Sequence, residues 1–172
     1  MKVIDKNELV NSLYESAIPC LERFFKEHKE ETFFGFAVEI LAEEGYFHIG
    51  ASSLESFQTI VDSYSQAGES MEEILGEGIK WNNQEWEYFN LNYGSEVWDN
   101  SWRPMLTKID DYKKYIGSLD DKRRGKALED FSDAFEAAAR EAFQRIVSSG
   151  ILEKIKKTSD FRAFVFEHHE VF

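Results

Sequence analysis

The chain has 172 residues, a length that favours one domain and leaves little room for two, so we expect residues 1–172 to form a single domain. Its 42% hydrophobic and 15% aromatic residues, with only two prolines, exclude a disordered or collagen-like chain. The single cysteine excludes an internal disulfide and is typical of a reducing compartment, so we expect a soluble protein of the cytoplasm.

Charge is distributed unevenly along the chain. The net formal charge is −13: residues 1–100 carry six Lys and Arg against twenty Asp and Glu, whereas residues 101–172 carry fourteen against thirteen. Such a negative field repels nucleic acid and anionic membranes and accelerates the approach of a basic protein. We therefore expect a basic protein partner, no nucleic acid and no membrane. Acidity that serves solubility alone gives the same pattern and stays open as an alternative.

The first third of the chain predicts a helix followed by a β-hairpin. From the capping residue Asp5 to about Lys29, apolar residues recur every three to four positions, and Pro19 inside this pattern indicates a kink. Residues 32–41 are rich in aromatic and β-branched side chains on both faces, which predicts a central strand. Residues 46–52 follow after a short turn and predict its hairpin partner.

The middle of the chain is less regular. A second helix is expected from Ser53 to Gly68, where a serine can cap the start and a glycine the end. Residues 79–82 are extended in character and are a candidate further strand. Residues 91–104 contain Gly and Pro and predict an ordered loop, after which residues 105–116 resume helical spacing.

The C-terminal third predicts the longest helix and the last strand. Residues 119–125 are charged and are expected to be flexible and open to proteolysis. Residues 126–148 carry the most regular helical stripe, and residues 160–167 alternate as a strand that joins the hairpin. Together the elements predict an α+β domain with a small, mostly antiparallel sheet packed against several helices.

Three stretches of sequence carry a family resemblance. They are ETFFGFAVEI at residues 31–40, KWNNQEWEYF at residues 80–89, and the helix AFEAAAREAFQRIVSSGIL at residues 134–152, which is followed by SDFRAFVFEHHE. From about residue 9 to 170 the chain resembles a bacterial family catalogued as domain of unknown function 4303. The resemblance implies a single α+β domain of the bacterial cytoplasm without an established activity. By extension from small acidic domains found beside polymorphic toxins, it also implies an immunity-like role.

Four tryptophans are the candidate partner-binding residues. Trp81, Trp86, Trp98 and Trp102 lie within 22 positions. Large aromatic side chains with a polar group are typical of interface hot spots, because each buries much area at low entropic cost. The alternative is that they cover the sheet as a second core. Trp98 and Trp102 lie in the predicted loop, so we expect this pair to be exposed.

Glu39 is the most unusual residue of the predicted central strand. A carboxylate there must be hydrogen-bonded, ion-paired or in solvent at the end of the sheet, and burial alone would raise its pKa, as in a general acid or base. Lys80, Arg162 or His48 can instead hold it in a structural ion pair.

Three histidines form the alternative metal hypothesis. His48, His168 and His169 are ligand types that zinc accepts, but neighbouring residues of a strand point to opposite faces, so the adjacent pair does not easily hold one ion. Solvated histidines at the end of the chain are the simpler interpretation. Cys20 is expected to be packed rather than reactive, because only Arg23 is near enough to stabilise a thiolate.

No nucleotide-binding, hydrolase, zinc-protease or calcium motif is present, so we expect no cofactor and assign no catalytic residue. The preferred hypothesis is a non-enzymatic protein-binding module, immunity-like, that neutralises a basic toxin or nuclease. In this hypothesis the acidic first hundred residues attract the partner and the tryptophans anchor it. The alternative is a small-molecule or metal-dependent enzyme with a site around Glu39, His48 and His168.

Overall fold

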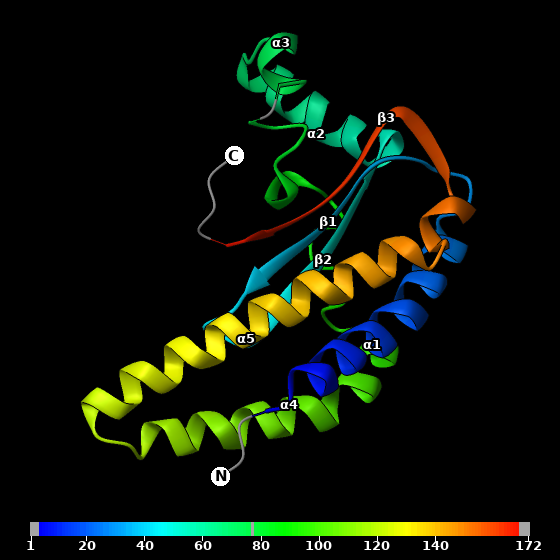
Figure 1. Cartoon of the computed structure of the whole chain (residues 1–172). Helices are drawn as coiled ribbons and strands as arrows, with labels where there is room; N and C mark the ends of the chain where they lie inside the picture. Colours follow the sequence, from blue (N-terminus) through cyan, green and yellow to red (C-terminus); the bar gives the residue numbers. More distant parts are fainter. Residues whose placement is uncertain (1–3, 77, 169–172) are drawn as a thin grey trace.

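The computed structural model describes residues 4–76 and 78–168 (Figure 1). In chain order the elements are α1 (Lys6–Glu27), β1 (Thr32–Leu41), β2 (Tyr46–Ser53), α2 (Leu54–Ala67), α3 (Met71–Ile74), the 3-10 helix η1 (Asn83–Glu85), α4 (Glu96–Gly117), α5 (Asp121–Ser148), the 3-10 helix η2 (Ile151–Lys154) and β3 (Lys156–Glu167). The α+β class predicted from the sequence is confirmed, and α5 is the longest helix, as expected.

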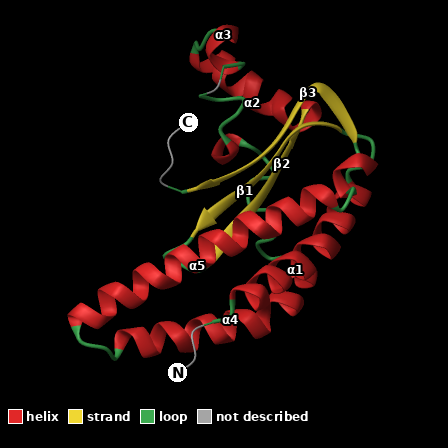
Figure 2. Ribbon diagram, viewed as in Figure 1, coloured by secondary structure: helices red, strands yellow, loops and turns green. Residues whose placement is uncertain are grey.

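A three-stranded sheet with the order β2-β1-β3 lies between two groups of helices (Figure 2). β1 is central, as its two apolar faces predicted, and β2 pairs with it antiparallel. β3 joins the hairpin as expected but runs parallel to β1, so the sheet is mixed rather than mostly antiparallel. The reason is the direction of α5, which returns the chain to the end of the sheet where β1 begins, so that Lys156 pairs beside Thr32.

The prediction of a further strand at residues 79–82 is wrong. Most of this segment forms turns, and the edge of β2 is instead met by an isolated bridge between Ala51 and Tyr88. The turn ends where Asn82 caps η1 by accepting a hydrogen bond from the backbone of Gln84. A short capped turn thus replaces the extended backbone that the residue types alone suggested.

Two helices begin earlier than predicted. α4 starts at Glu96, inside the expected loop, because Ser95 caps it and the apolar spacing already begins at Trp98. α5 starts at Asp121, capped by Asp120, so most of the segment 119–125 is helical rather than flexible. A strong cap therefore extended each helix through residues that looked like loop. The predicted first helix is confirmed with Pro19 inside it.

Each face of the sheet has its own core. The main core lies between α1, α4, α5 and one face of the sheet, and includes Leu13, Phe36, Ile49 and Phe135, all fully buried. A smaller core on the other face joins β1 to α2, α3 and the segment around η1. Helices therefore cover both faces, which explains why β1 is apolar on both sides.

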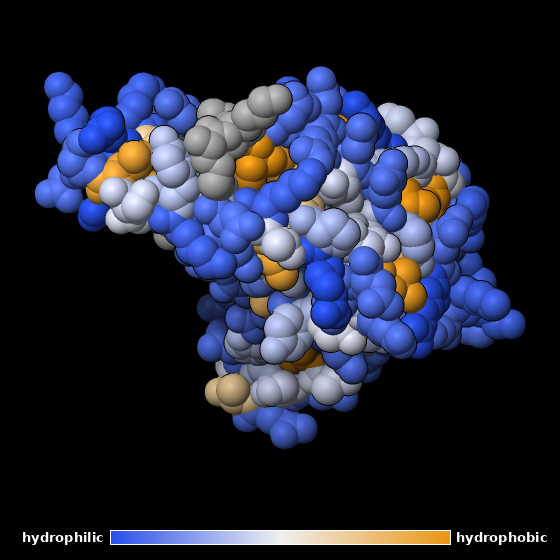
Figure 3. Space-filling view, turned by 90° about the horizontal axis from the view of Figure 1, so that it is seen from below, coloured by the Kyte–Doolittle hydropathy of each residue, from blue (hydrophilic) through white to orange (hydrophobic). Residues whose placement is uncertain are grey.

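Hydrophobic residues are scattered on the surface seen from below. On this face hydrophilic residues predominate and hydrophobic ones appear as small, separated patches (Figure 3). Among residues 4–76 and 78–168, no helix combines the length and hydropathy that crossing a bilayer requires.

Candidate functional site

All four tryptophans are buried, with exposed fractions of 7% for Trp81, 3% for Trp86, 1% for Trp98 and 2% for Trp102. Trp81 and Trp86 pack edge-on against Phe34 in the smaller core, which is the alternative that the sequence left open. The expectation that Trp98 and Trp102 are exposed is wrong, because the early start of α4 turns both indoles into the main core. A buried indole offers no contact surface, so the exposed fractions do not support these tryptophans as partner-binding residues.

Glu39 near the end of β1 is fully buried and accepts three hydrogen bonds. His48, its cross-strand neighbour, places Nδ1 3.2 Å from Oε2, and His168, just beyond β3, places Nδ1 2.7 Å from Oε1. Nε2 of Gln84 donates to Oε1 at 3.2 Å. The three strands and η1 therefore converge on one carboxylate, and the structure brings together the residues of the alternative hypothesis.

The hydrogen bonds keep this carboxylate ionised. Burial raises the pKa of Glu39, but the hydrogen bonds from His48, His168 and Gln84 outweigh burial and lower the pKa to about 2. The raised pKa of a general acid is therefore not found here. Because an ionised carboxylate only accepts hydrogen bonds, each imidazole must donate to it through Nδ1–H, which fixes the orientation of both rings.

The two cations considered as partners of Glu39 lie elsewhere. Lys80 Nζ is 2.7 Å from Asp160 Oδ2, and the guanidinium carbon of Arg162 lies 4.1 Å from the centroid of the Trp81 ring. Both contacts join β3 to the segment before η1. Of the three partners that the sequence suggested for Glu39, His48 is the correct one.

A metal centre is not favoured by this arrangement. Within the part of the chain that the structure describes, no group of three or more His, Cys, Asp or Glu side chains is arranged to hold a metal ion. The two imidazoles instead bind opposite oxygens of Glu39, which orients the rings. The third histidine of the metal hypothesis, His169, lies outside the described residues.

The segment 90–95 is held along the outer edge of β2 by a backbone hydrogen bond, in which Leu91 N donates to Ile49 O at 2.8 Å, and by one buried side chain. Asn92 accepts from the backbone of Ile49 at 2.8 Å through Oδ1, and its Nδ2 donates to Phe47 O at 3.1 Å and to the Tyr46 hydroxyl at 3.2 Å. On either side of it, Asn90 and Gly94 both have a φ of 69°, a left-handed conformation that Asn and Gly adopt most easily. The amide of Asn92 thus takes the place of a strand neighbour and fixes a sharply turned loop beside β2.

This loop forms one wall of an open hollow of about 510 Å³. The lining residues come from β2, the loop and the first turn of α4: Tyr46, His48, Asn90, Tyr93, Gly94 and Asp99. We call this the His48 hollow. Asp99 belongs to no ion pair of the described residues, and Oδ1 of Asn90 is buried without a hydrogen-bond partner among them. Burial, followed by the negative charge of Asp99, raises the pKa of Tyr46, so its phenol stays protonated.

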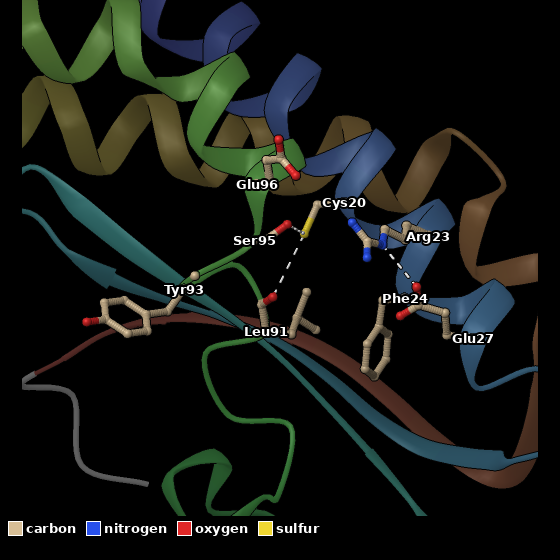
Figure 4. A pocket seen from close by; sticks show the side chains of 9 residues that line it. Cys20, Arg23, Phe24, Glu27, Leu91, Tyr93, Ser95 and Glu96 are labelled. Atoms are coloured by element: carbon tan, nitrogen blue, oxygen red, sulfur yellow. Dashed lines mark hydrogen bonds and ion pairs between the residues drawn. The ribbon is translucent and has the colours of Figure 1, made fainter.

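A second hollow of about 420 Å³ lies across the same loop, lined in part by Cys20, Glu27, Ser95 and Glu96 (Figure 4). The Tyr93 ring points away from Cys20, to the far side of the loop (Figure 4). The Sγ of Cys20 lies 3.5 Å from Ser95 Oγ, and burial raises the pKa of the thiol more than that contact lowers it. Cys20 is therefore a packed thiol, as predicted, and not a nucleophile.

Sequence reasoning missed a second polar cluster at the start of β1. Glu31, just before this strand, accepts from the Tyr88 hydroxyl at 2.9 Å and from the Ser53 hydroxyl, and lies 2.6 Å from Nδ1 of His28. Burial raises the pKa of Glu31, but the hydrogen bonds outweigh it and keep the pKa low. Ser53 and Tyr88 are far from His28 and Glu31 in the sequence, and only a polar residue directly before an apolar strand could have drawn attention to the cluster. The cluster joins α1, β2 and the bridging segment, so its role is structural.

A family model described as a domain of unknown function (DUF4303) matches residues 13–171. No curated protein and no solved structure matches the chain.

Proposed function

The chain belongs to the DUF4303 family, as the sequence resemblance predicted, and we propose that it is a non-enzymatic protein-binding module for a basic protein. The observation that carries the proposal is the charge of residues 30–102, which we call the acidic segment. It contains fifteen Asp and Glu against a single Lys or Arg, Lys80, and so has a formal charge of −14.

The single cation of the acidic segment is already neutralised. The Lys80 side chain is only 16% exposed and pairs with Asp160 of β3. Elsewhere the charges compensate one another: on α4 and α5, for example, Lys114 pairs with Asp111 and Arg140 with Glu136. The net negative charge of the molecule therefore comes from one continuous segment of its sequence.

Much of this charge lies on exposed helix surface. Asp62 on α2 and Glu72 on α3 are exposed, and neither forms an ion pair with a described residue. α2 and α3 stand together at one end of the molecule, away from α4 and the far end of α5 (Figure 1). A field with this geometry accelerates and orients the approach of a positively charged protein. An immunity-like role in the bacterial cytoplasm, neutralising a basic toxin or nuclease, is the specific form of the proposal that the family resemblance suggests.

The test is a binding titration against the most basic of the proteins encoded by the neighbouring genes, followed by calorimetry at 50 and 300 mM NaCl. We expect a one-to-one complex whose Kd rises at least tenfold with salt. The variant Asp62→Asn/Glu72→Gln should weaken the complex, whereas Asp110→Asn/Asp133→Asn, with the same change of charge on α4 and α5, should not. A Kd that is insensitive to salt, or equal effects of the two variants, would overturn the proposal.

A second candidate function is favoured by one observation. His48 lines an open hollow while its Nδ1–H is held by a buried carboxylate, an arrangement that also orients a general base in small-molecule enzymes. We propose it as the alternative. His48→Gln separates the two functions: it should abolish turnover of a small substrate if the alternative is correct, and should leave a salt-dependent protein complex in place if it is not.

A further inference from the structure

The His48 hollow offers a ligand a carboxylate and a histidine ring nitrogen. His48 donates its Nδ1–H to Glu39, so Nε2 is its remaining ring nitrogen, which is an acceptor when the ring is neutral. Asp99 adds a carboxylate at the first turn of α4, and this carboxylate has no cationic partner among the described residues. Asn90 lines the hollow as well, and its side-chain oxygen is buried without a hydrogen-bond partner among the described residues. A ligand rich in donors and without acceptors matches such a lining.

The aromatic groups of the hollow add a second requirement. Tyr46 and Tyr93 both line it, and Tyr93 is 78% exposed, so its ring is free to cover a ligand. Flat cations stack on aromatic faces, and a guanidinium group has five N–H donors, no acceptor and a permanent positive charge. A volume of about 510 Å³ is ample for such a group and part of the chain that carries it.

We propose that the His48 hollow binds an alkylguanidinium group, presented as an arginine side chain of the basic partner. Asp99 supplies the countercharge, Tyr93 stacks on the guanidinium plane, and His48 accepts one of its N–H groups. Glu39 does not touch the ligand; it is a positioning residue that fixes the tautomer of His48. The inference rests on the proposed function, because it assigns the place on the acidic segment where one side chain of the partner is recognised.

The binding is tested with blocked tripeptides and ¹⁵N-labelled protein. Acetyl-Gly-Arg-Gly-amide should shift the resonances of Tyr46, His48, Tyr93 and Gly94 with a Kd of the order of 1 mM, since it fills one small charged site. The matching citrulline peptide, which has nearly the same shape without the charge, should bind at least tenfold more weakly. Equal binding of the two peptides, or arginine-induced shifts elsewhere with none in the hollow, would overturn the inference.

Matched variants locate the site. Asp99→Asn and Tyr93→Ala should each weaken the arginine peptide at least fivefold, and both residues are exposed, so the fold should persist. Asp62→Asn, with the same loss of charge on α2, should leave the Kd unchanged. If Asp62→Asn weakens the peptide as much as Asp99→Asn does, only the general negative field is involved and the hollow is not the site.

Butylguanidinium distinguishes a free ligand from a protein side chain. Butylguanidinium carries the same guanidinium group and the same single charge without peptide bonds, so it should bind no more tightly than the arginine peptide. Binding of butylguanidinium without binding of the peptide would refute an arginine side chain as the ligand. Failure of this inference remains distinct from failure of the proposed function: a salt-sensitive complex that Asp99→Asn leaves unchanged contradicts only the hollow, whereas peptide binding without a basic protein partner contradicts only the function.

Discussion

Replacing Glu39 by glutamine tests the electrostatic account of the sheet end. The carboxylate is fully buried, and its hydrogen bonds lower its pKa from 4.5 to about 2. By linkage, this difference stabilises the folded state by about 3 kcal/mol at neutral pH. The amide removes the charge and places an N–H donor opposite an imidazole N–H, so Glu39→Gln should lower the free energy of unfolding by about 2–4 kcal/mol at pH 7.

The effect has a defined dependence on pH. Because the folded pKa is below the unfolded one, the stabilisation is fully present above about pH 5 and is lost as the pH falls through 4.5 towards 2. About 2 kcal/mol should already be lost at pH 3. Urea unfolding at pH 7, 5, 4 and 3 should therefore show wild type and Glu39→Gln converging as the pH falls.

A neighbouring carboxylate provides the control. Glu43 lies in the turn after β1 and is exposed, so Glu43→Gln should change the free energy of unfolding by less than about 0.5 kcal/mol at every pH. If the gap between wild type and Glu39→Gln stays constant from pH 7 to 3, the variant acts through packing alone, and the ionised carboxylate contributes nothing.

Three further changes probe packing and the loop. A Cβ at Gly35 would lie 2.5 Å from the Trp86 ring, so Gly35→Ala should destabilise the fold by about 1–3 kcal/mol in thermal unfolding. Gly125 lies on α5 with open space around it, so Gly125→Ala should stabilise the fold by up to about 1 kcal/mol. If Gly35→Ala is the more stable of the two variants, the packing of Trp86 against β1 is contradicted. Asn92→Ala should cost about 3 kcal/mol and speed hydrogen exchange at the β2 edge, and exchange that matches wild type would refute its bridging role. Cys20 should react with a thiol reagent far more slowly in the native protein than in 6 M urea, because burial raises its pKa; equal rates would mean that the thiol is accessible.

The regular elements could be predicted from the sequence because their signals are local. α1, the β1–β2 hairpin and α5 each show a cap, a short turn or an apolar period that identifies the element, although α5 begins five residues before its predicted start. α4 was missed at its start because Gly94 and Pro104 look like breaks, although Trp98 and Trp102 already follow the helical spacing. The expectation that Trp98 and Trp102 are exposed was a consequence of that error.

The candidate site was predictable only in part, since it depends on pairing between distant residues. A short turn between two strands sets Glu39 opposite His48, so this contact follows from the hairpin. The contact with His168 requires β3 to run parallel to β1, and no local pattern specifies that direction. The loop held by Asn92 has no periodic pattern in its sequence, so the sequence does not predict the His48 hollow.

The position of β3 has a consequence for folding during synthesis on the ribosome. Its partner β1 is synthesised early, but the two strands can pair only after all of β3, Lys156–Glu167, has been synthesised. At typical translation speeds this interval is of the order of ten seconds. During this interval the edge of β1 that will pair with β3 is unpaired and apolar, so it can bind chaperones or aggregate. The central strand β1 is therefore prone to aggregation until β3 has been synthesised and paired with it.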